Sequence, residues 1–352
     1  MRPFTYTGLP ARVIFGSGTV SVLAEEIKAL KASRALVLTT PPQAPQGEQI
    51  TEELGSLAAG MFTRAAMHTP VAVTEEAMKA YDKAGADCVV SIGGGSTIGL
   101  GKAIALRNGT PQIVLPTTYA GSEMTSIIGQ TEQGEKTTQK TLKVLPETVI
   151  YDVNFTLSLP VGMSVTSGMN AIAHAVEALY AEQANPVLSL MAEEGISALF
   201  GALPRIVASP QDPDARSDAL YGAWLCAVCL GSGGVALHHK LCHVLGGSFD
   251  LPHAETHTIV LPHALAYNAP AIPDAMTALK RATGSDDPAG KFFDIARQGG
   301  APAGLRDLGM PESEIDRAVE IAFRNPYFNP RPLEEAGIRR IIRAAWAGDR
   351  PS

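Results

Sequence analysis

The chain has 352 residues, of which 45% are hydrophobic and 18% charged, a composition typical of a folded globular protein rather than a disordered one. Its formal net charge of −7 excludes non-specific nucleic-acid binding as a main role, although a local cationic pocket can still hold a small anionic substrate. The sequence has no uninterrupted apolar run of membrane length and no signal-peptide core, and its four cysteines are scattered. We therefore expect a cytoplasmic protein with no disulfide framework and no membrane contact.

The first half of the chain alternates strand-like apolar runs with helical patterns. Strands are predicted at residues 34–40, 86–94, 111–118 and 147–152. A helix is predicted over 74–85, so the pattern indicates a Rossmann-like parallel sheet with helices on both faces. Ligands bind such sheets at the carboxyl ends of the strands. Those ends are Thr39–Thr40, Gly93–Ser96 and Pro116–Ser122. We predict an α/β dinucleotide-binding domain over residues 1–155.

The second half has the spacing of helices and almost no strand pattern. Helical periodicity is found in residues 165–182, 190–207, 218–247 and 338–348. We therefore predict an all-α substrate and catalytic domain over residues 156–352, joined to the first near 153–160. The active site is expected in the cleft between the two domains.

The stretch "VVSIGGGSTIGLGKAIAL" predicts a strand, a triple-glycine turn and a helix. Glycines let a ligand approach the backbone, and the free N–H groups of the helix start favour an anion. The turn matches neither the usual dinucleotide pattern nor a P-loop, so an ordinary βα turn is an equal alternative at this point and phosphotransfer is disfavoured. The hydroxyl-rich loop "LPTTYAGSEMT" at another strand end favours a dinucleotide. The candidate cofactor-binding residues are Thr39, Gly93, Gly94, Gly95, Ser96, Thr97, Lys102, Thr117, Thr118, Tyr119 and Ser122.

Six of the eight histidines lie in "LHHKLCHVLGGSFDLPHAETHTIVLPH". His239 and His243 are four residues apart, on a helix expected to end at Gly246-Gly247, and His253 follows past a loop. Asn170 and His174 have the same spacing on an earlier helix. This pattern is compatible with a divalent-cation site. His238, His257 and His263 are interpreted as buried core histidines, and Cys226-x-x-Cys229 as core cysteines.

Taken together, these motifs resemble the iron-containing (group III) alcohol dehydrogenase family over nearly the whole chain. The family's "GGGSxxDxxK" turn corresponds to "GGGSTIGLGK", its "PTTxxxGSE" loop to "PTTYAGSE", and its "DAxxHAxEA" helix to "NAIAHAVEA". Its "HxxxHxLG…PHG" segment corresponds to "HKLCHVLGGSFDLPHA", and "NPR" is present as Asn329-Pro330-Arg331. The resemblance implies the dehydroquinate synthase-like, iron-containing alcohol dehydrogenase fold.

The resemblance would place the family's metal ligands on Asn170, His174, His239 and His253. Asn170 stands where the family has Asp, which removes the one anionic ligand from a site that iron(II) usually shares with a carboxylate. Gly99 replaces the turn's Asp, and Ala254 replaces the Gly after Pro252-His253. We therefore expect no bound metal.

These departures resemble one branch of the family, the maleylacetate reductases. The resemblance implies NADH- or NADPH-dependent reduction of the C=C bond of 2-maleylacetate to 3-oxoadipate, an oxidoreductase reaction on a CH–CH group in bacterial degradation of aromatics such as chlorocatechols, hydroxyquinol and resorcinols. It also implies metal independence and a homodimer. Two alternatives remain: a metal-dependent alcohol or glycerol dehydrogenase of the same family, and a non-catalytic nucleotide-binding protein.

Reduction of an enone puts negative charge on a ketone oxygen, which hydrogen-bond donors can stabilise, and the carbanion then needs a proton. We assign His243 as the principal acid or oxyanion donor, assisted by His253 and His239, with His174 and Asn170 holding the network in position.

The substrate carries two negative charges, so cationic side chains are expected to bind it. The candidates are Lys102, Lys240, Arg324 and Arg331. Because no carboxylate follows the strand ending at Thr39, both NADH and NADPH are expected to work.

Overall fold

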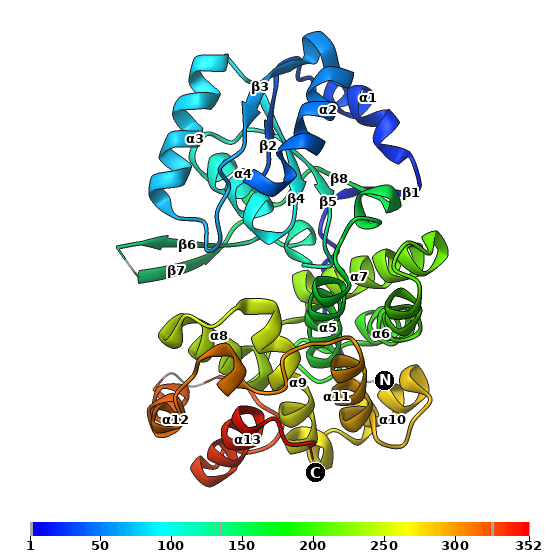
Figure 1. Ribbon diagram of the computed structural model, residues 1–352, viewed down its shortest axis with the longest axis vertical. Coiled ribbons are helices and arrows are strands. Elements are labelled where there is room, and N and C mark those ends of the chain that lie inside the picture. Colours follow the sequence, from blue (N-terminus) through cyan, green and yellow to red (C-terminus); the bar gives the residue numbers. More distant parts are fainter. Residues whose placement is uncertain (1–2, 134, 325–326, 352) are drawn as a thin grey trace. The chain divides into compact units, whose positions relative to one another are not determined.

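The computed structural model describes residues 3–133, 135–324 and 327–351. The chain forms two compact units (Figure 1). One comprises Gly8–Leu159, and the other comprises Pro160–Ser352 together with Met1–Thr7.

The first unit is built on a six-stranded parallel sheet in the order β1-β8-β5-β4-β2-β3 (Figure 1). Its strands are β1 (Arg12–Gly16), β2 (Ala35–Leu38), β3 (Ala58–Phe62), β4 (Cys88–Gly93), β5 (Gln112–Pro116) and β8 (Thr148–Asp152). The four predicted strands are confirmed as β2, β4, β5 and β8. The strands β1 and β3 were not predicted. Both are edge strands whose residues are mostly half-buried.

Helices cover both faces of this sheet, as the alternation of elements predicted. They are α1 (Leu23–Ala29), α2 (Ala44–Leu54), α3 (Val71–Ala84) and α4 (Gly95–Asn108). Successive strand residues point to opposite faces: Val37 packs in the core formed with α1 and α2, whereas Leu36 packs in the core formed with α3 and α4. The helix predicted at 74–85 is α3.

A polar hairpin follows β5 and was not predicted. Its strands, β6 (Ile127–Glu132) and β7 (Glu135–Lys140), pair antiparallel outside the main sheet. The segment is rich in Thr, Gln and Lys and buries little apolar surface, so its sequence has no apolar alternation to indicate a strand.

In the second unit the described residues form helices and no named strand, which confirms the all-α prediction. The helices are α5 (Val161–Ala178), α6 (Pro186–Ala208), α7 (Pro213–Gly233), α8 (Leu237–Phe249), α9 (His253–Asn268), α10 (Pro273–Thr283), α11 (Pro288–Gln298), α12 (Ile315–Phe323) and α13 (Glu335–Ala347). Three of them begin with an Asn or Asp side chain that accepts a backbone N–H, followed by proline at the first helical position. This pairing of cap and proline is a strong helix-start signal.

The helix that carries His239 and His243 is longer than predicted. We expected it to end at Gly246-Gly247, but α8 continues through both glycines to Phe249. It ends at Asp250, whose φ of 53° is left-handed. The prediction was wrong because the stop is supplied by Asp250, one of the residue types that tolerate this conformation.

One described helix, α6, is long and apolar enough to cross a membrane by length and composition, and the bent pair of α7 and α8 passes the same test together. Both signals are weak. Helix α6 has Glu193 and Glu194 at its centre and packs against α5, α7 and α10, as the core helix of a globular domain does.

Candidate functional site

The glycine turn joins β4 to α4 in a conformation that leaves space beside the backbone. Gly93 has φ of 155°, and a Cβ there would collide with the side chain of Thr97. Gly94 is the N-cap of α4 and provides no side-chain cap. Gly95 is exposed, and a Cβ built on it would meet nothing within 4 Å. The first N–H groups of a helix have no partner within that helix, so this open start fits an anionic ligand.

The second hydroxyl-rich loop lies against this turn. Gly93 and Pro116 are partners in the β4–β5 register, and Thr117 N donates to Gly93 O at 3.2 Å. A Cβ on Gly94 would lie 2.8 Å from Thr118 Oγ1. The structure therefore brings the two predicted loops together at one sheet edge.

Two buried hydroxyls at this edge have no hydrogen-bond partner. Thr39, at the end of β2, and Thr97, in the first turn of α4, are both 0% exposed with an unpartnered Oγ1. Beside them, the amide of Gln43 donates to the hydroxyl of Thr117. A buried polar atom without a partner is costly, so these hydroxyls fit an edge built to bind a polar group. Tyr119, by contrast, is wholly buried.

Lys102 points into the interior of the first unit. Its ammonium is wholly buried and donates to Ser122 O at 2.6 Å, Thr125 O at 2.7 Å and Ile127 O at 2.9 Å, and also to Thr125 Oγ1. Burial lowers the pKa of Lys102 to about 7, an effect that the charge of Glu123 opposes. The structure thus gives Lys102 a clear role in holding the backbone of residues 122–127, whereas its contact with cofactor or substrate stays a prediction.

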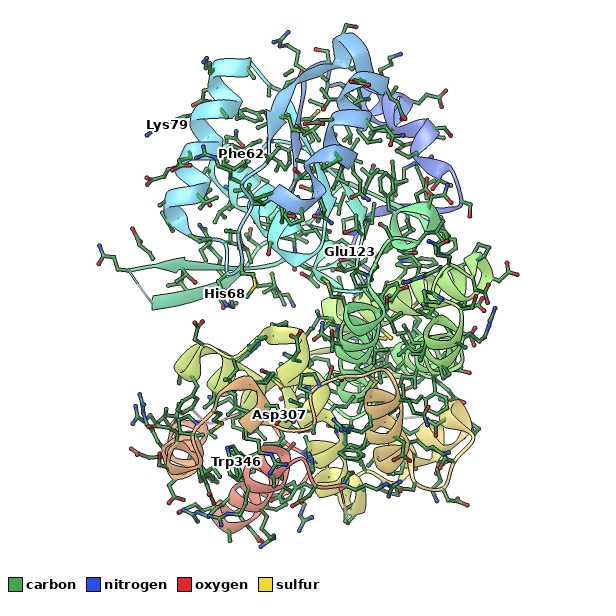
Figure 2. The ribbon with its side chains drawn as sticks, in the orientation of Figure 1. Phe62, His68, Lys79, Glu123, Asp307 and Trp346 are labelled. Carbon is green, nitrogen blue, oxygen red and sulfur yellow. The ribbon has the colours of Figure 1, made fainter. Side chains whose placement is uncertain are left out.

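Glu123 (labelled in Figure 2) lies in the same buried network. Its Oε1 accepts a hydrogen bond from the Tyr151 hydroxyl at 2.9 Å. Burial raises the pKa of this carboxyl, while the bond from Tyr151 and the charge of Lys102 act in the opposite direction. A buried lysine and a buried carboxyl therefore lie at residues 122–127, the segment that directly follows the loop with Thr117 and Thr118.

Gly99, the second departure from the family pattern, faces a side chain that fills the adjacent space. A Cβ at this position would collide with the hydroxyl of Thr69. Thr69 is buried and has a φ of 47°, which a β-branched residue rarely adopts. Thr69 thus occupies the room that a side chain on this turn of α4 would need.

In the second unit, six histidine rings from α5, α8 and α9 form one cluster. The ring centroids of His174 and His239 are 5.1 Å apart and stacked, and those of His239 and His243 are 6.2 Å apart. His257 links the group, with centroids 4.2 Å from His253, 5.0 Å from His239 and 4.9 Å from His238. The prediction that His174, His239, His243 and His253 lie together is confirmed, and Asn170 is buried one turn before His174 on α5.

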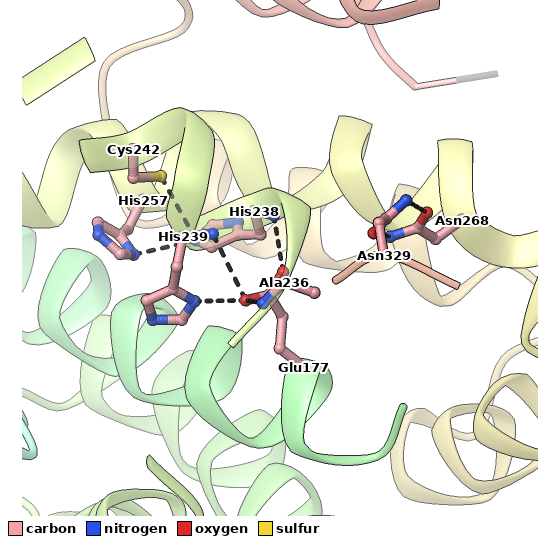
Figure 3. Close-up of polar contacts among 8 residues, drawn as sticks. All are labelled: Glu177, Ala236, His238, His239, Cys242, His257, Asn268 and Asn329. Atoms are coloured by element: carbon pink, nitrogen blue, oxygen red, sulfur yellow. Dashed lines mark hydrogen bonds and ion pairs between the residues drawn. The ribbon is translucent and has the colours of Figure 1, made fainter. Parts of the chain in front are cut away.

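Glu177, also on α5, organises the start of α8 (Figure 3). Its wholly buried carboxylate accepts the backbone N–H groups of Ala236 and His238, each at 2.7 Å, and that of His239 at 3.4 Å. Glu177 Oε2 also lies 2.7 Å from His239 Nδ1. The carboxylate can only accept, so Nδ1 carries the hydrogen of this bond, while Nε2 is buried without a hydrogen-bond partner.

Exposure divides the cluster into two layers. His243 and His253 are exposed, whereas His174, His238, His239 and His257 are at most 4% exposed. Burial, followed by the charges of neighbouring histidines, holds the pKa of His174, His238 and His257 well below the ordinary histidine value. These three rings are neutral at neutral pH, and the rings of His243 and His253 are the members of the cluster that solvent reaches.

The family's metal can be tested against this donor set. Asn170 contributes an amide and His174, His239 and His253 contribute imidazoles, so none of the four brings a negative charge. The nearby carboxylate of Glu177 is engaged by three backbone N–H groups and by His239. A neutral set compensates poorly for the hydration that a divalent iron ion loses, so these residues do not fit a resident iron ion.

Three of the predicted substrate cations lie in the second unit, and each contacts a group of the protein. Lys240 lies 5.3 Å from the centroid of the Tyr327 ring, and Arg324 is an exposed partner of Glu320. Arg331 packs 4.1 Å from the Tyr267 ring centroid and donates to the Tyr267 carbonyl at 2.7 Å. Their assignment to the substrate stays a prediction.

The sequence did not predict a role for Glu177, and it did not predict that His238 and His257 belong to the histidine cluster. Glu177 follows Asn170 and His174 by seven and three residues, a spacing that puts all three on one helix face and could have indicated it. His238 and His257 are buried, as predicted, but hydrogen-bond each other at 3.0 Å inside the cluster. Asn329 of the NPR motif forms a reciprocal amide pair with Asn268 at the end of α9 (Figure 3).

Comparison with known families covers most of the chain. The model for iron-containing alcohol dehydrogenase matches residues 10–153. The model for the C-terminal part of the Fe-containing alcohol dehydrogenase family matches residues 164–346. The two matches fall on the α/β unit and the helical unit respectively.

Full-length relatives are found at high identity. A maleylacetate reductase from Rhizobium sp. (strain MTP-10005) is 56% identical over 351 residues, which cover 100% of both chains. One from Burkholderia cepacia is 53% identical over 352 residues, also covering 100% of both. The crystal structure of maleylacetate reductase from Agrobacterium tumefaciens has a TM-score of 0.96 and 54% identity, with 100% of both chains covered.

Proposed function

The chain belongs to the iron-containing alcohol dehydrogenase family and, within it, to the maleylacetate reductases, and from this membership we propose that it reduces the C=C bond of 2-maleylacetate to 3-oxoadipate with NADH or NADPH. Its substrate is a small dianion, and its pathway is the bacterial degradation of aromatic compounds. We propose further that it acts without a resident metal, in the cytoplasm and as a homodimer. Four buried free cysteines suit a reducing compartment.

The observation that carries this proposal is the neutral donor set around Asn170. Alcohol oxidation uses a Lewis acid to stabilise an alkoxide. Enone reduction instead places charge on a ketone oxygen conjugated with the double bond, and hydrogen-bond donors can stabilise it. An aspartate at position 170 could only accept hydrogen bonds, whereas the amide of Asn170 can also donate them.

NAD(P)H supplies the hydride when it is bound. Its phosphates fit the open start of α4 and the hydroxyl-rich loop beside it, where the cofactor-binding residues predicted from the sequence lie. Because the end of β2 carries Thr39 and Thr40 and no carboxylate, a 2′-phosphate meets no repulsion there. We therefore expect NADH and NADPH to be used with less than about a hundredfold difference, equivalent to about 2.7 kcal/mol.

The proton is delivered by the two exposed histidines of the cluster, His243 and His253. His243 is accessible and lies next to the ring of His239, so it is the principal acid or oxyanion donor, with His253 assisting. His239 is held in one orientation by Glu177, and His174 stacks on it. His239 assists from this fixed orientation, and His174 and Asn170 hold the network in position.

The test follows NADH and NADPH oxidation optically with maleylacetate, simple aldehydes and glycerol-type ketones, with and without EDTA. The proposal expects turnover with maleylacetate that EDTA does not change. Chelator-sensitive activity with aldehydes or ketones and stoichiometric metal in the protein would support a metal-dependent alcohol or glycerol dehydrogenase instead. Nucleotide binding without turnover of any of these compounds would support the non-catalytic alternative.

A further inference from the structure

Three chemically distinctive side chains meet inside the second unit but are not used in the proposed reaction. His238 and Cys242 are four residues apart on α8, and His257 comes from α9 (Figure 3). Their ligand atoms all lie within 4.8 Å of one another, and the side chains are at most 3% exposed. No other group of His, Cys, Asp or Glu within the described ranges meets this criterion.

The separations suit a tetrahedral cation site. Zinc bonds of about 2.0–2.1 Å to nitrogen and 2.3 Å to sulfur place two nitrogens roughly 3.3 Å apart, and a nitrogen and a sulfur roughly 3.6 Å apart. His238 Nε2 lies 3.0 Å from His257 Nδ1, and Cys242 Sγ lies 3.5 Å from His238 Nε2. Small side-chain movements would therefore suffice to admit an ion.

The donor types also define the class of ion. Two imidazole nitrogens and one sulfur favour zinc and softer ions, whereas magnesium and calcium need oxygen ligands. In the same trio, His238 Nδ1 and His257 Nε2 are buried without a hydrogen-bond partner. These are the nitrogens opposite the ligand atoms, so they can carry the ring hydrogens when His238 Nε2 and His257 Nδ1 bind an ion.

We propose that His238, Cys242 and His257 form a binding site for a borderline or soft divalent cation such as Zn²⁺. This site is separate from the set of Asn170, His174, His239 and His253 to which the family resemblance points. On binding, the thiol S–H bond breaks, a sulfur–metal bond forms, and the proton passes to solvent. The hydrogen shared by His238 Nε2 and His257 Nδ1 moves to the opposite nitrogen of the ring that carries it, so both ligand nitrogens offer lone pairs. A dication replacing one proton adds one positive charge to the interior.

Occupation of the site inhibits the reductase, a consequence that rests on the proposed function. The ring of His257 lies 4.2 Å from that of His253 and 5.0 Å from that of His239. A cation bound to His257 places positive charge beside these two rings and fixes the ring that lies between them. The binding itself does not depend on which reaction the enzyme performs.

The test titrates full-length, EDTA-treated protein with Zn²⁺ by calorimetry and with Co²⁺ by absorption spectroscopy. We expect one equivalent to bind and the Co²⁺ form to show a thiolate-to-cobalt charge-transfer band. Cys242→Ser should lose that band and weaken binding at least about tenfold. Cys226→Ser is the matched control, because Cys226 is equally buried on α7 and belongs to no such group among the described residues.

Absence of binding, or Co²⁺ binding without a thiolate band in the unsubstituted protein, would overturn the site, and neither result depends on a variant that folds. Zn²⁺ should also lower maleylacetate reduction in proportion to occupancy, with recovery in EDTA. Retained activity at full occupancy would refute the inhibitory role. If maleylacetate is not reduced at all, the proposed function fails while the titrations still decide whether the site exists.

Discussion

His239 Nδ1 and Glu177 Oε2 lie 2.7 Å apart, and both side chains are buried. The same carboxylate accepts backbone N–H groups from the first residues of α8. One acidic side chain therefore both caps a helix and fixes the tautomer of a histidine in the cluster. Helix starts favour negative charge, so the two roles reinforce each other.

Glu177→Gln should lower both stability and turnover. An amide can accept only with its oxygen, so at least one buried N–H group loses its partner, at a cost of about 1–3 kcal/mol in the free energy of unfolding. His239 is then free to take either tautomer, which should lower kcat more than it changes KM. Glu182→Gln, an exposed carboxylate just beyond α5, is the control for both measurements. An unchanged kcat in Glu177→Gln would show that the orientation of His239 does not matter.

His243→Ala should abolish most of the activity without unfolding the protein. General acid catalysis contributes a factor of about 10²–10⁴ to the rate, so kcat should fall within that range. His243 is exposed, so the melting temperature should change little. Ser248→Ala, an exposed change on the same helix, controls for effects on α8. Full turnover in His243→Ala would remove His243 from the catalytic group.

Asn170→Asp should make the protein bind divalent metal. The substitution restores one negative charge to a set of neutral donors, which favours Fe²⁺ or Zn²⁺. Position 170 is 3% exposed, so without metal the new carboxylate should lower the melting temperature, and added metal should raise it again. Calorimetry and metal-dependent melting test this directly. Undetectable metal binding would mean that the amide is not what keeps metal out.

Lys102→Met should affect cofactor binding more than substrate binding. The ammonium holds three carbonyls of residues 122–127, directly after the loop carrying Thr117 and Thr118. Its loss should raise the Kd for NADH by about tenfold, or about 1.4 kcal/mol, and leave the KM for maleylacetate nearly unchanged. The exposed Lys79 (Figure 2) provides the control, as Lys79→Met. The opposite pattern, a raised KM for maleylacetate alone, would indicate direct contact with the substrate.

The stability of the protein should fall as the pH drops from 6.5 towards 4, in part through His263. Burial lowers the pKa of His263 from 6.5 to about 4 in the folded protein. In that window the unfolded chain binds more protons, so acidification favours unfolding, by about 3 kcal/mol at full effect. Denaturant unfolding at several pH values should show a shallower slope in His263→Gln than in the unsubstituted protein. Equal slopes would mean that His263 is protonated in the fold.

The parts of the site set by local sequence were predictable, and those set by distant contacts were not. The glycine turn, the second loop and the spacing of His239 and His243 are local patterns. The structure confirms that the turn lies beside the second loop in the first unit, and that His239 lies near His243 in the second. The helix-face spacing of Glu177 could have indicated that it lies near Asn170 and His174, but not its role, because its partners are backbone groups about 60 residues away. Lys102 lies on a predicted helix near the turn, but its contacts depend on how residues 122–127 return over α4.

The elements of the fold also differ in how well the local sequence predicted them. Strands with continuous apolar runs were predicted, because burial on both faces leaves a clear signal. The polar hairpin of β6 and β7 was not, since pairing rather than apolar content defines it. The edge strands β1 and β3 were also missed, although both have apolar residues in succession. The extension of α8 to Phe249 was missed because two glycines there do not break the helix.

The packing of Gly99 against Thr69 limits how this sequence can change over evolution. A side chain at position 99 would collide with Thr69, so the aspartate that the resemblance associates with this turn could not return by a single substitution without displacing its neighbour. The two positions are coupled, and a smaller residue at 69 would have to come first or arise together with it. The route from this reductase towards its alcohol-oxidising relatives therefore includes coupled changes at positions 99 and 69 in the α/β unit, in addition to any change at Asn170 in the helical unit.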